Sequence, residues 1–212
     1  MLAKILVRGW IRVKTTWQST VMPFINRIKL RGMGVQFGKN CIVRSSFSLR
    51  VGRTANVEIG DNFRITGSNL ANPLCKNQSC INVAEGAKMI IGNNVGMSSP
   101  TIYVHESLVI GNHVNLGGGI TILDSDCHSL NYLDRRVGTV DQKNKKNKAI
   151  EIDDDVLIGA YCIILKGVHI GARSVIGAGS VVSRDVPPDC IAAGNPCKVI
   201  RLLDNNSRKK QI

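Results

Sequence analysis

A six-residue repeat between Ile152 and Pro187 limits what this chain can fold into. An aliphatic residue holds the first place of six consecutive hexads: Ile152, Ile158, Ile164, Ile170, Ile176 and Val182. A helix has about 3.6 residues per turn, so apolar residues spaced six apart would not stay on one side of it. A short strand followed by a turn fits the period, with branched side chains inward and glycine at the turn. Three such sides make a coil of about 18 residues, and stacked coils make a parallel β-helix.

The composition supports a narrow solenoid. Of the 212 residues, 43% are hydrophobic but only 4% are aromatic, so Ile, Val, Leu, Ala and Cys must fill the core. This length is enough for one domain with a buried core. None of the seven cysteines forms a C-x-x-C pair, which indicates a reducing compartment rather than a disulfide framework. We therefore expect a cytoplasmic protein.

The net charge of +13 is concentrated near the start of the chain, where 11 Lys and Arg residues precede the first acidic residue, Glu58. Nucleic acid is one partner that such an excess could serve. The sequence contains no recognisable helix-turn-helix, zinc-finger or RNA-binding signature, and aromatic residues for base stacking are scarce. We therefore expect no nucleic-acid binding.

Residues 1–28 show a helical period. The apolar stripe consists of Leu2, Leu6, Trp10, Val13, Trp17, Val21 and Phe24. The basic residues opposite it are Lys4, Arg8, Arg12 and Lys14. The pattern predicts a basic amphipathic helix that is broken near Pro23 and is neither a signal peptide nor a membrane span. Two interpretations stay open: the helix caps the β-helix, or it lies on an anionic membrane surface.

The repeat divides the chain into three parts. We expect a basic helical segment at residues 1–34, a β-helix domain at 35–190, and a closing segment with a polar tail at 191–212. Two stretches interrupt the repeat, at residues 66–80 and 129–149. A long loop inside an economical solenoid is more often functional than accidental, so both interruptions are candidate parts of a binding site.

His128 stands where the repeat gives way to the second interruption. In an extended strand, alternate side chains share a face, which would place Asp124 and Asp126 on the same side as His128. A carboxylate beside an imidazole fixes its tautomer and suits it to act as a general base. Cys127 is a poorer nucleophile candidate, because adjacent strand residues diverge, and a metal site of Asp126, Cys127 and His128 lacks a second ligand cluster. We expect no metal.

Three stretches together carry a resemblance to a known family. They are the hexads, ITILDSDCHSL at residues 120–130, and IGAGSVVSRDVPPDCIAAGNPCKVIR at residues 176–201. Over roughly residues 50–203, the chain resembles the hexapeptide-repeat acyltransferases, in particular the sugar O-acetyltransferases related to galactoside and maltose acetyltransferases and those of bacterial capsule, O-antigen and exopolysaccharide gene clusters. The resemblance implies a left-handed parallel β-helix and a homotrimer, with acetyl-CoA bound between neighbouring subunits.

The resemblance also implies roles for single residues. His128 is similar to the catalytic base of the family, which takes a proton from the acceptor hydroxyl. The positions that match the CoA-binding residues are Ala160, Ala178, Ser183, Arg184, Lys198 and Arg201. Residues 117–119 read GGG where relatives often carry an Asn, a departure that bears on the acceptor pocket.

These observations predict an acetyl-CoA-dependent O-acetyltransferase that acts on a sugar or oligosaccharide hydroxyl. The basic segment 1–28 favours a surface-polysaccharide component or its lipid-linked precursor as acceptor, with peripheral contact at the inner face of the cytoplasmic membrane. One alternative is a xenobiotic acetyltransferase acting on an antibiotic, although those enzymes usually carry a longer insertion before the histidine. A non-catalytic hexapeptide scaffold is another. A γ-class carbonic anhydrase relative would need three metal-binding histidines, which the spacing of His105, His113 and His128 does not suggest.

Overall fold

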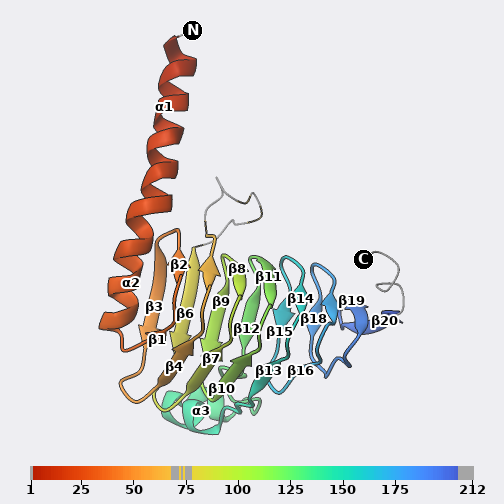
Figure 1. The fold of residues 1–212 in the computed structure, drawn as a ribbon. Coiled ribbons are helices and arrows are strands. Elements are labelled where there is room, and N and C mark those ends of the chain that lie inside the picture. Colours follow the sequence, from red (N-terminus) through yellow and green to blue (C-terminus); the bar gives the residue numbers. More distant parts are fainter. Residues whose placement is uncertain (1, 68–71, 73, 75–77, 205–212) are drawn as a thin grey trace.

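The strands of the chain wind around a common axis and stack into three parallel sheets (Figure 1). The computed structural model describes residues 2–67, 72, 74 and 78–204. The tail at 205–212 and most of the interruption at 66–80 lie outside the described residues. This arrangement of the strands confirms the predicted parallel β-helix, with the N-terminal helix at one end of it.

Each of the first six circuits of the chain adds one strand to each of the three sheets. Sheet A contains β1 (Gln36–Phe37), β4 (Asn56–Ile59), β7 (Lys88–Ile91), β10 (Ser107–Ile110), β13 (Ile150–Ile152) and β16 (His169–Ile170). Sheet B contains β2 (Ile42–Val43), β5 (Arg64–Ile65), β8 (Gly96–Ser98), β11 (Asn115–Gly118), β14 (Leu157–Ile158), β17 (Val175–Ile176), β19 (Cys190–Ala193) and β20 (Lys198–Leu202). Sheet C contains β3 (Phe47–Val51), β6 (Ser79–Val83), β9 (Thr101–Val104), β12 (Thr121–Leu123), β15 (Ile163–Ile164) and β18 (Val181–Val182). The turns that join successive sheets are called here the A–B, B–C and C–A corners.

The hexads keep the register that their spacing predicts. Ile152 pairs with Ile170 one coil later, 18 residues along the chain, and Ile158 pairs with Ile176 in the same way. All six first-place residues are at most 1% exposed. The residues at the fifth place of each hexad are buried too: Val156, Cys162, Val168, Ser174, Ser180 and Val186. Two of the fifth-place residues are serines, Ser174 and Ser180, whose hydroxyls donate to backbone carbonyls. The core of this region is thus a column of branched side chains, and the two buried serine hydroxyls within it have partners.

Glycine is required where the corners of successive coils approach each other. A Cβ on Gly159 would lie 2.5 Å from the backbone nitrogen of Ala178, and one on Gly117 would lie 2.5 Å from that of Ala160. Backbone atoms of a stacked coil cannot move aside as a flexible side chain can. Small residues therefore form a column along the B–C corner.

The N-terminal helix is longer than predicted. α1 (Leu2–Thr16), η1 (Trp17–Val21) and α2 (Met22–Gly32) follow one another without a break, so the predicted break near Pro23 is wrong. Proline gives no N–H to the preceding turn, and its ring crowds the carbonyl there. The π-helical turn of η1, in which the N–H of Met22 donates to the carbonyl of Trp17, accommodates Pro23 at the start of α2. No helix in the described part of the chain is long and apolar enough to cross a membrane.

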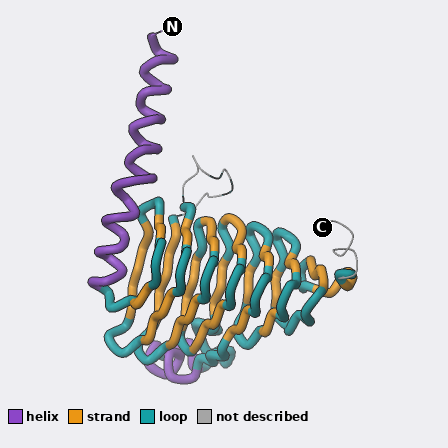
Figure 2. Tube along the Cα trace, viewed as in Figure 1, coloured by secondary structure: helices purple, strands orange, loops and turns teal. Residues whose placement is uncertain are grey.

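α2 covers the open end of the first coil. The Asn26 side chain is 2% exposed and donates to the carbonyls of Val43 and Ser45, both at 2.8 Å. Leu30 is equally buried in the core. α1 instead extends away from the β-helix (Figures 1 and 2). The cap that the sequence allowed is therefore made by α2, while α1 makes a separate element.

The coil closes at its C-terminal end with a reversal of direction. β19 pairs in parallel with β17, and β20 then pairs antiparallel with β19. Arg173 binds Asp189 through two hydrogen bonds of 2.6 Å, which fix the segment between the last full coil and β19. All five residues of β20 are exposed.

Candidate active site

The longest interruption of the repeat forms a compact loop at the C–A corner. β12 ends at Leu123 and β13 begins at Ile150, and between them lie η2 (Asp134–Arg136) and α3 (Gly138–Asn144). The two ends of this loop are held together by a bridge between Ser125 and Asn147 and by the N–H of Lys148, which donates to the Asp124 carbonyl at 2.8 Å. The loop is therefore an ordered part of the corner, and it carries His128.

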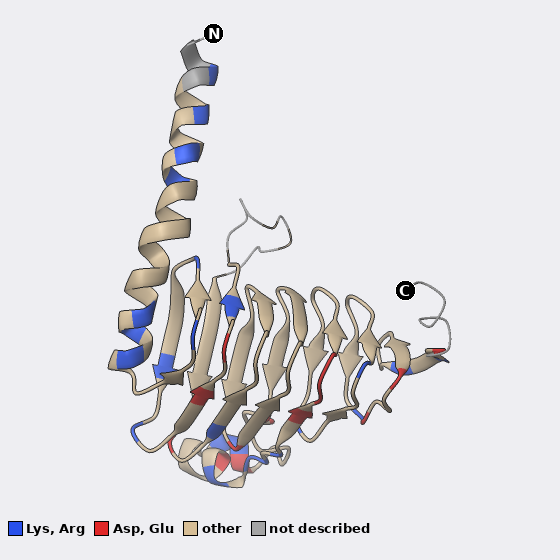
Figure 3. Ribbon diagram, viewed as in Figure 1, with Lys and Arg blue, Asp and Glu red and all other residues tan. Residues whose placement is uncertain are grey.

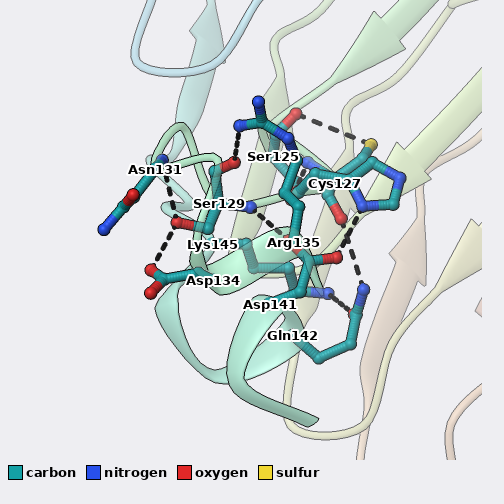
Figure 4. Close-up of polar contacts among 10 residues, drawn as sticks. Ser125, Cys127, Ser129, Asn131, Asp134, Arg135, Asp141, Gln142 and Lys145 are labelled. Carbon is teal, nitrogen blue, oxygen red and sulfur yellow. Dashed lines mark hydrogen bonds and ion pairs between the residues drawn. The ribbon is translucent and has the colours of Figure 1, made fainter. Parts of the chain in front are cut away.

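His128 is paired with an acidic residue of the loop. Its Nδ1 atom lies 2.6 Å from Oδ2 of Asp141, which is on α3. The other oxygen of Asp141 accepts the backbone N–H of Ser129 at 2.7 Å (Figure 4). The Asp141 side chain is 7% exposed, whereas that of His128 is 66% exposed. The buried carboxylate of Asp141 thus holds the Nδ1 edge of the imidazole, and most of the His128 side chain stays exposed.

The charge state of Asp141 determines the tautomer of His128. The hydrogen bond from His128 lowers the pKa of Asp141 below its ordinary value, and the N–H of Ser129 lowers it further. An ionised carboxylate can only accept hydrogen bonds, so Nδ1 of His128 carries the proton. Nε2 then keeps its lone pair and is free to accept a proton, as a general base must.

A second set of contacts keeps Asp141 in place. Ser129 donates its hydroxyl to Asp134 at 2.7 Å, and Asn144 donates to the same carboxylate at 2.9 Å. Both hydrogen bonds lower the pKa of Asp134, and the one from Asn144 lowers it most. The guanidinium of Arg135 donates to the carbonyl of Ser129 at 2.7 Å (Figure 4). The peptide segment that follows His128 is thereby fixed from both sides.

α3 is also tied to the wall of the β-helix. Lys145, directly after α3, lies with Nζ 3.0 Å from Oε1 of Gln142 and 3.3 Å from Nδ1 of His105. Gln142 in turn donates to the carbonyl of Cys127 at 3.4 Å. Burial lowers the pKa of His105, and the neighbouring Lys145 lowers it further, so His105 is held neutral. It therefore belongs to the support of the loop.

Asp124 does not lie at His128, contrary to the prediction. Its carboxylate is 1% exposed and accepts the backbone N–H groups of His105, Glu106 and Ser107 at 2.7–2.9 Å. It therefore fixes the preceding C–A corner, one coil away in the stack. The carboxylate that contacts His128 is that of Asp141.

Asp126 is also engaged elsewhere, in an ion pair with Lys166 at 3.3 Å. The prediction required an extended chain from residue 124 to residue 128. β12 ends at Leu123, however, and Cys127 has a φ of +63°. This turn removes the alternation of faces on which the prediction depended.

The weaker alternatives at this loop gain no support from the geometry. The Sγ atom of Cys127 donates to the carbonyl of Ser125, and the backbone N–H of Cys127 donates to the Ser125 hydroxyl. Among the described residues, no group of three or more His, Cys, Asp or Glu is placed to hold a metal ion. His113 and His169 contact Asn94 and Asp153, respectively, and neither contact involves the loop.

The six positions matched to CoA binding fall on different parts of the β-helix. Ala160 follows β14 and Ala178 follows β17, so both belong to the small-residue column at the B–C corner. Ser183 and Arg184 follow β18 at the C–A corner. Lys198 and Arg201 lie on β20. A single chain therefore presents these positions on two separate corners and an edge strand.

The cations of this group are available to a ligand. Arg184, Lys198 and Arg201 are all exposed, and none of them takes part in an ion pair with another described residue. Phosphate groups are the natural partners of such cations. An uncharged ligand arm would suit the small-residue column, and a phosphorylated ligand group would suit these cations.

The glycines at residues 117–119 have a structural explanation. A Cβ on Gly118 would lie 2.8 Å from Leu74, and one on Gly119 would lie 2.8 Å from the Tyr161 ring. Tyr161 donates its hydroxyl to the carbonyl of Leu74 at 2.8 Å. The glycines thus make room for a contact between the B–C corner and a described residue of the interruption at 66–80.

Comparison with known proteins agrees with this architecture. Residues 149–184 match the family model described as bacterial transferase hexapeptide (six repeats). The chain is 38% identical over 109 residues to a galactoside O-acetyltransferase of Lactococcus lactis, which covers 51% of this chain and 50% of that protein. It is 41% identical over 98 residues to a putative acetyltransferase of Schizosaccharomyces pombe, covering 46% and 44%. The match thus spans about half the length of these relatives or less.

Similarity to solved structures extends further along the chain. A hexapeptide-repeat acetyltransferase of Vibrio cholerae, solved with acetyl coenzyme A, matches 94% of this chain and 88% of its own at 26% identity and a TM-score of 0.58. A Bacillus cereus N-acyltransferase solved with dTDP and coenzyme A shares the fold, at 20% identity, 85% and 91% coverage and a TM-score of 0.62. These likenesses confirm the left-handed β-helix that the resemblance predicts. Together with the hexads, they show that the chain is similar to hexapeptide-repeat transferases, in sequence over residues 149–184 and in fold over most of its length.

Proposed function

We propose that the protein is an acetyl-CoA-dependent O-acetyltransferase that acts on a sugar hydroxyl. The observation that carries the proposal is the pairing of His128 with Asp141, which leaves Nε2 of an exposed imidazole free to accept a proton. The names of the relatives support the reaction class, since the Lactococcus protein is a galactoside O-acetyltransferase.

In the proposed reaction, His128 acts directly on the acceptor. Nε2 takes the hydroxyl proton while the acceptor oxygen forms a bond to the thioester carbon. The carbon–sulfur bond then breaks, and the imidazolium returns the proton to the leaving sulfur. Asp141 stabilises the imidazolium that exists between these events, because its carboxylate stays ionised beside Nδ1. General-base catalysis of this kind contributes about 10²–10⁴-fold in rate.

Acetyl-CoA is the proposed donor. The column containing Ala160 and Ala178 would leave space for the pantetheine arm, and Ser183, on the C–A corner, would flank that arm where two copies meet. Arg184, Lys198 and Arg201 would meet the phosphates. Acetyl supplied as a thioester provides the activated carbonyl, and no metal is part of the proposal.

A homotrimer is part of the same proposal. The positions assigned to the donor lie on the B–C and C–A corners of one chain, so the groove between two copies would join them into one site. The loop also exposes a group of apolar side chains that a neighbouring copy would cover: Leu130, Tyr132, Leu133 and Val137. We propose that acceptor and donor meet His128 in that groove.

The proposed acceptor is a surface-polysaccharide component or its lipid-linked precursor, met at the cytoplasmic face of the membrane. The loop at 129–149 would border the groove in this arrangement and select the acceptor. Tyr161, whose hydroxyl donates to the carbonyl of Leu74, follows Ala160 in the chain. It would therefore connect the interruption at 66–80 with the proposed donor site.

Turnover of acetyl-CoA with a panel of sugars and oligosaccharides tests the proposal. We expect acceptor-dependent release of CoA with at least one sugar, reduced about 10²-fold or more in His128→Ala. His113→Ala is the matched control, because His113 lies at the A–B corner, and it should keep wild-type turnover. Wild-type activity in His128→Ala would exclude the general-base role. Turnover with hydroxylated antibiotics and with no sugar would contradict the acceptor class.

A further inference from the structure

The N-terminal helix is divided by η1 into a fixed part and a free part. α2 is bound to the first coil through the buried residues Asn26 and Leu30. Every side chain from residue 6 to residue 13 on α1 is exposed, and α1 extends beyond the β-helix (Figure 1). The fold therefore holds α1 away from its own core, although nothing in the capping of the coil requires residues 2–16.

α1 and the start of η1 expose large apolar side chains along one face. Leu6, Trp10, Val13 and Trp17 are spaced four, three and four residues apart, so they share a side of the helix. They are 65%, 60%, 71% and 53% exposed. A continuous exposed apolar stripe of this kind marks an interaction surface, because removing apolar surface from water is favourable.

The charge on α1 specifies the partner. Lys4, Arg8 and Arg12 follow one another at four-residue intervals and form a second face, which Figure 3 shows as a row of blue on the helix. No acidic residue precedes Glu58. Lys14 lies with Nζ 4.9 Å from the centre of the Trp10 ring, so a cation and an aromatic meet at the edge of the stripe. A partner of this helix must therefore offer an apolar surface to the stripe and negative charge to the cations.

We infer that α1 and η1 form a membrane-binding helix that lies in the interface of a bilayer rich in anionic lipid, while α2 anchors it to the β-helix. A helix in this position buries its apolar face at the acyl boundary and leaves its cations among the headgroups. Tryptophan favours that level of the bilayer, because its ring is apolar and its N–H is polar. The inference names the surface at which the proposed reaction takes place, but it does not depend on the chemistry.

A second copy of α1 is the competing occupant. The four, three, four spacing also suits a helix pair, but paired helices need opposite charges beside the seam, and this segment offers only cations. Copies placed side by side would bring like charges together with no acidic residue to offset them. Anionic lipid removes that repulsion, which is why we favour it.

Tryptophan fluorescence of the 212-residue chain tests the inference, because the chain has two tryptophans and both lie in this segment. We expect vesicles of equal phosphatidylglycerol and phosphatidylcholine to shift the emission to shorter wavelength, and pure phosphatidylcholine to leave it unchanged. The shift should weaken as salt is raised, since the attraction is screened. No substrate is present, so the outcome is independent of whether the protein transfers acetyl groups.

Charge-removal variants make the test specific. Lys4→Gln/Arg8→Gln/Arg12→Gln should weaken vesicle binding about 10²-fold, since each cation contributes about fivefold at an anionic surface. Lys39→Gln/Lys88→Gln/Lys146→Gln removes the same charge from exposed sites on the β-helix and its loop, and should stay within about twofold. Equal weakening by both triple variants, or no shift with anionic vesicles, would overturn the inference. An emission that depends on protein concentration without vesicles would assign the stripe to a second copy instead.

Discussion

Nδ1 of His128 lies 2.6 Å from Oδ2 of Asp141, a residue 13 positions further along the chain. The contact exists because the loop at 129–149 folds back on itself and places α3 beside the start of the excursion. It gives the imidazole a defined tautomer, with the free nitrogen on the exposed side. The loop therefore supplies the acidic partner of the histidine, and the β-helix holds the loop in position.

Asp124 should matter for stability rather than for turnover. Replacing it with Ala would leave three partly buried backbone N–H groups without their acceptor, and each unsatisfied group costs about 1–3 kcal/mol. We expect Asp124→Ala to lower the free energy of unfolding in urea by about 3 kcal/mol or more. Asp126→Ala, which breaks only the ion pair with Lys166, should cost about 1 kcal/mol or less. Equal losses in the two variants would contradict the structural role of Asp124.

Gly159 should resist even the smallest substitution. A Cβ at this position would meet the backbone nitrogen of Ala178 at 2.5 Å, so Gly159→Ala must push two coils apart. We expect a loss of about 1–3 kcal/mol in the free energy of unfolding. Gly9→Ala places the same methyl group on α1, where no atom lies within 4 Å, and should cause no loss. A neutral Gly159→Ala would mean that the corners are less tightly stacked than the structure indicates.

His169 should make a small, pH-dependent contribution to stability. Its hydrogen bond to Asp153, with Nε2 and Oδ1 3.0 Å apart, raises the pKa of His169 above the ordinary 6.5. Because the folded value is the higher one, the contribution is complete below about pH 6.5 and is lost as the pH rises through the folded pKa. The pair is half exposed, so we expect about 0.5 kcal/mol at most.

Unfolding measured at several pH values between about 5 and 9 checks this prediction. The difference in free energy between the wild type and His169→Gln should be largest at acidic pH and vanish at alkaline pH. A difference that grows as the pH rises would mean that Asp153 does not stabilise the protonated imidazole.

The repeat allowed the fold to be predicted because it is strictly local. An inward branched residue every six positions specifies a strand and a turn at each step, and the structure keeps that register from Ile152 to Val182. The break predicted at Pro23 failed because a π turn absorbed the proline, a possibility that periodicity does not reveal.

The site was harder to predict than the fold. His128 stood out by its place at the end of the repeat, but its partner lies in a segment without a repeat, where spacing carries no geometric information. The alternation rule selected Asp124 and Asp126, and the left-handed turn at Cys127 defeats that rule. The loop contains only two acids, Asp134 and Asp141, which was the one available signal.

Turnover by Asp141→Asn tests the central claim most directly. An amide at this position can hold Nδ1 unprotonated, which places the proton on Nε2 and removes the base. We expect kcat to fall about 10²-fold or more, with the KM for acetyl-CoA and the melting temperature unchanged, while Asp126→Asn stays within about fivefold of the wild type. A wild-type kcat in Asp141→Asn, or an equal loss in Asp126→Asn, would contradict the assignment of Asp141 as the residue that positions His128.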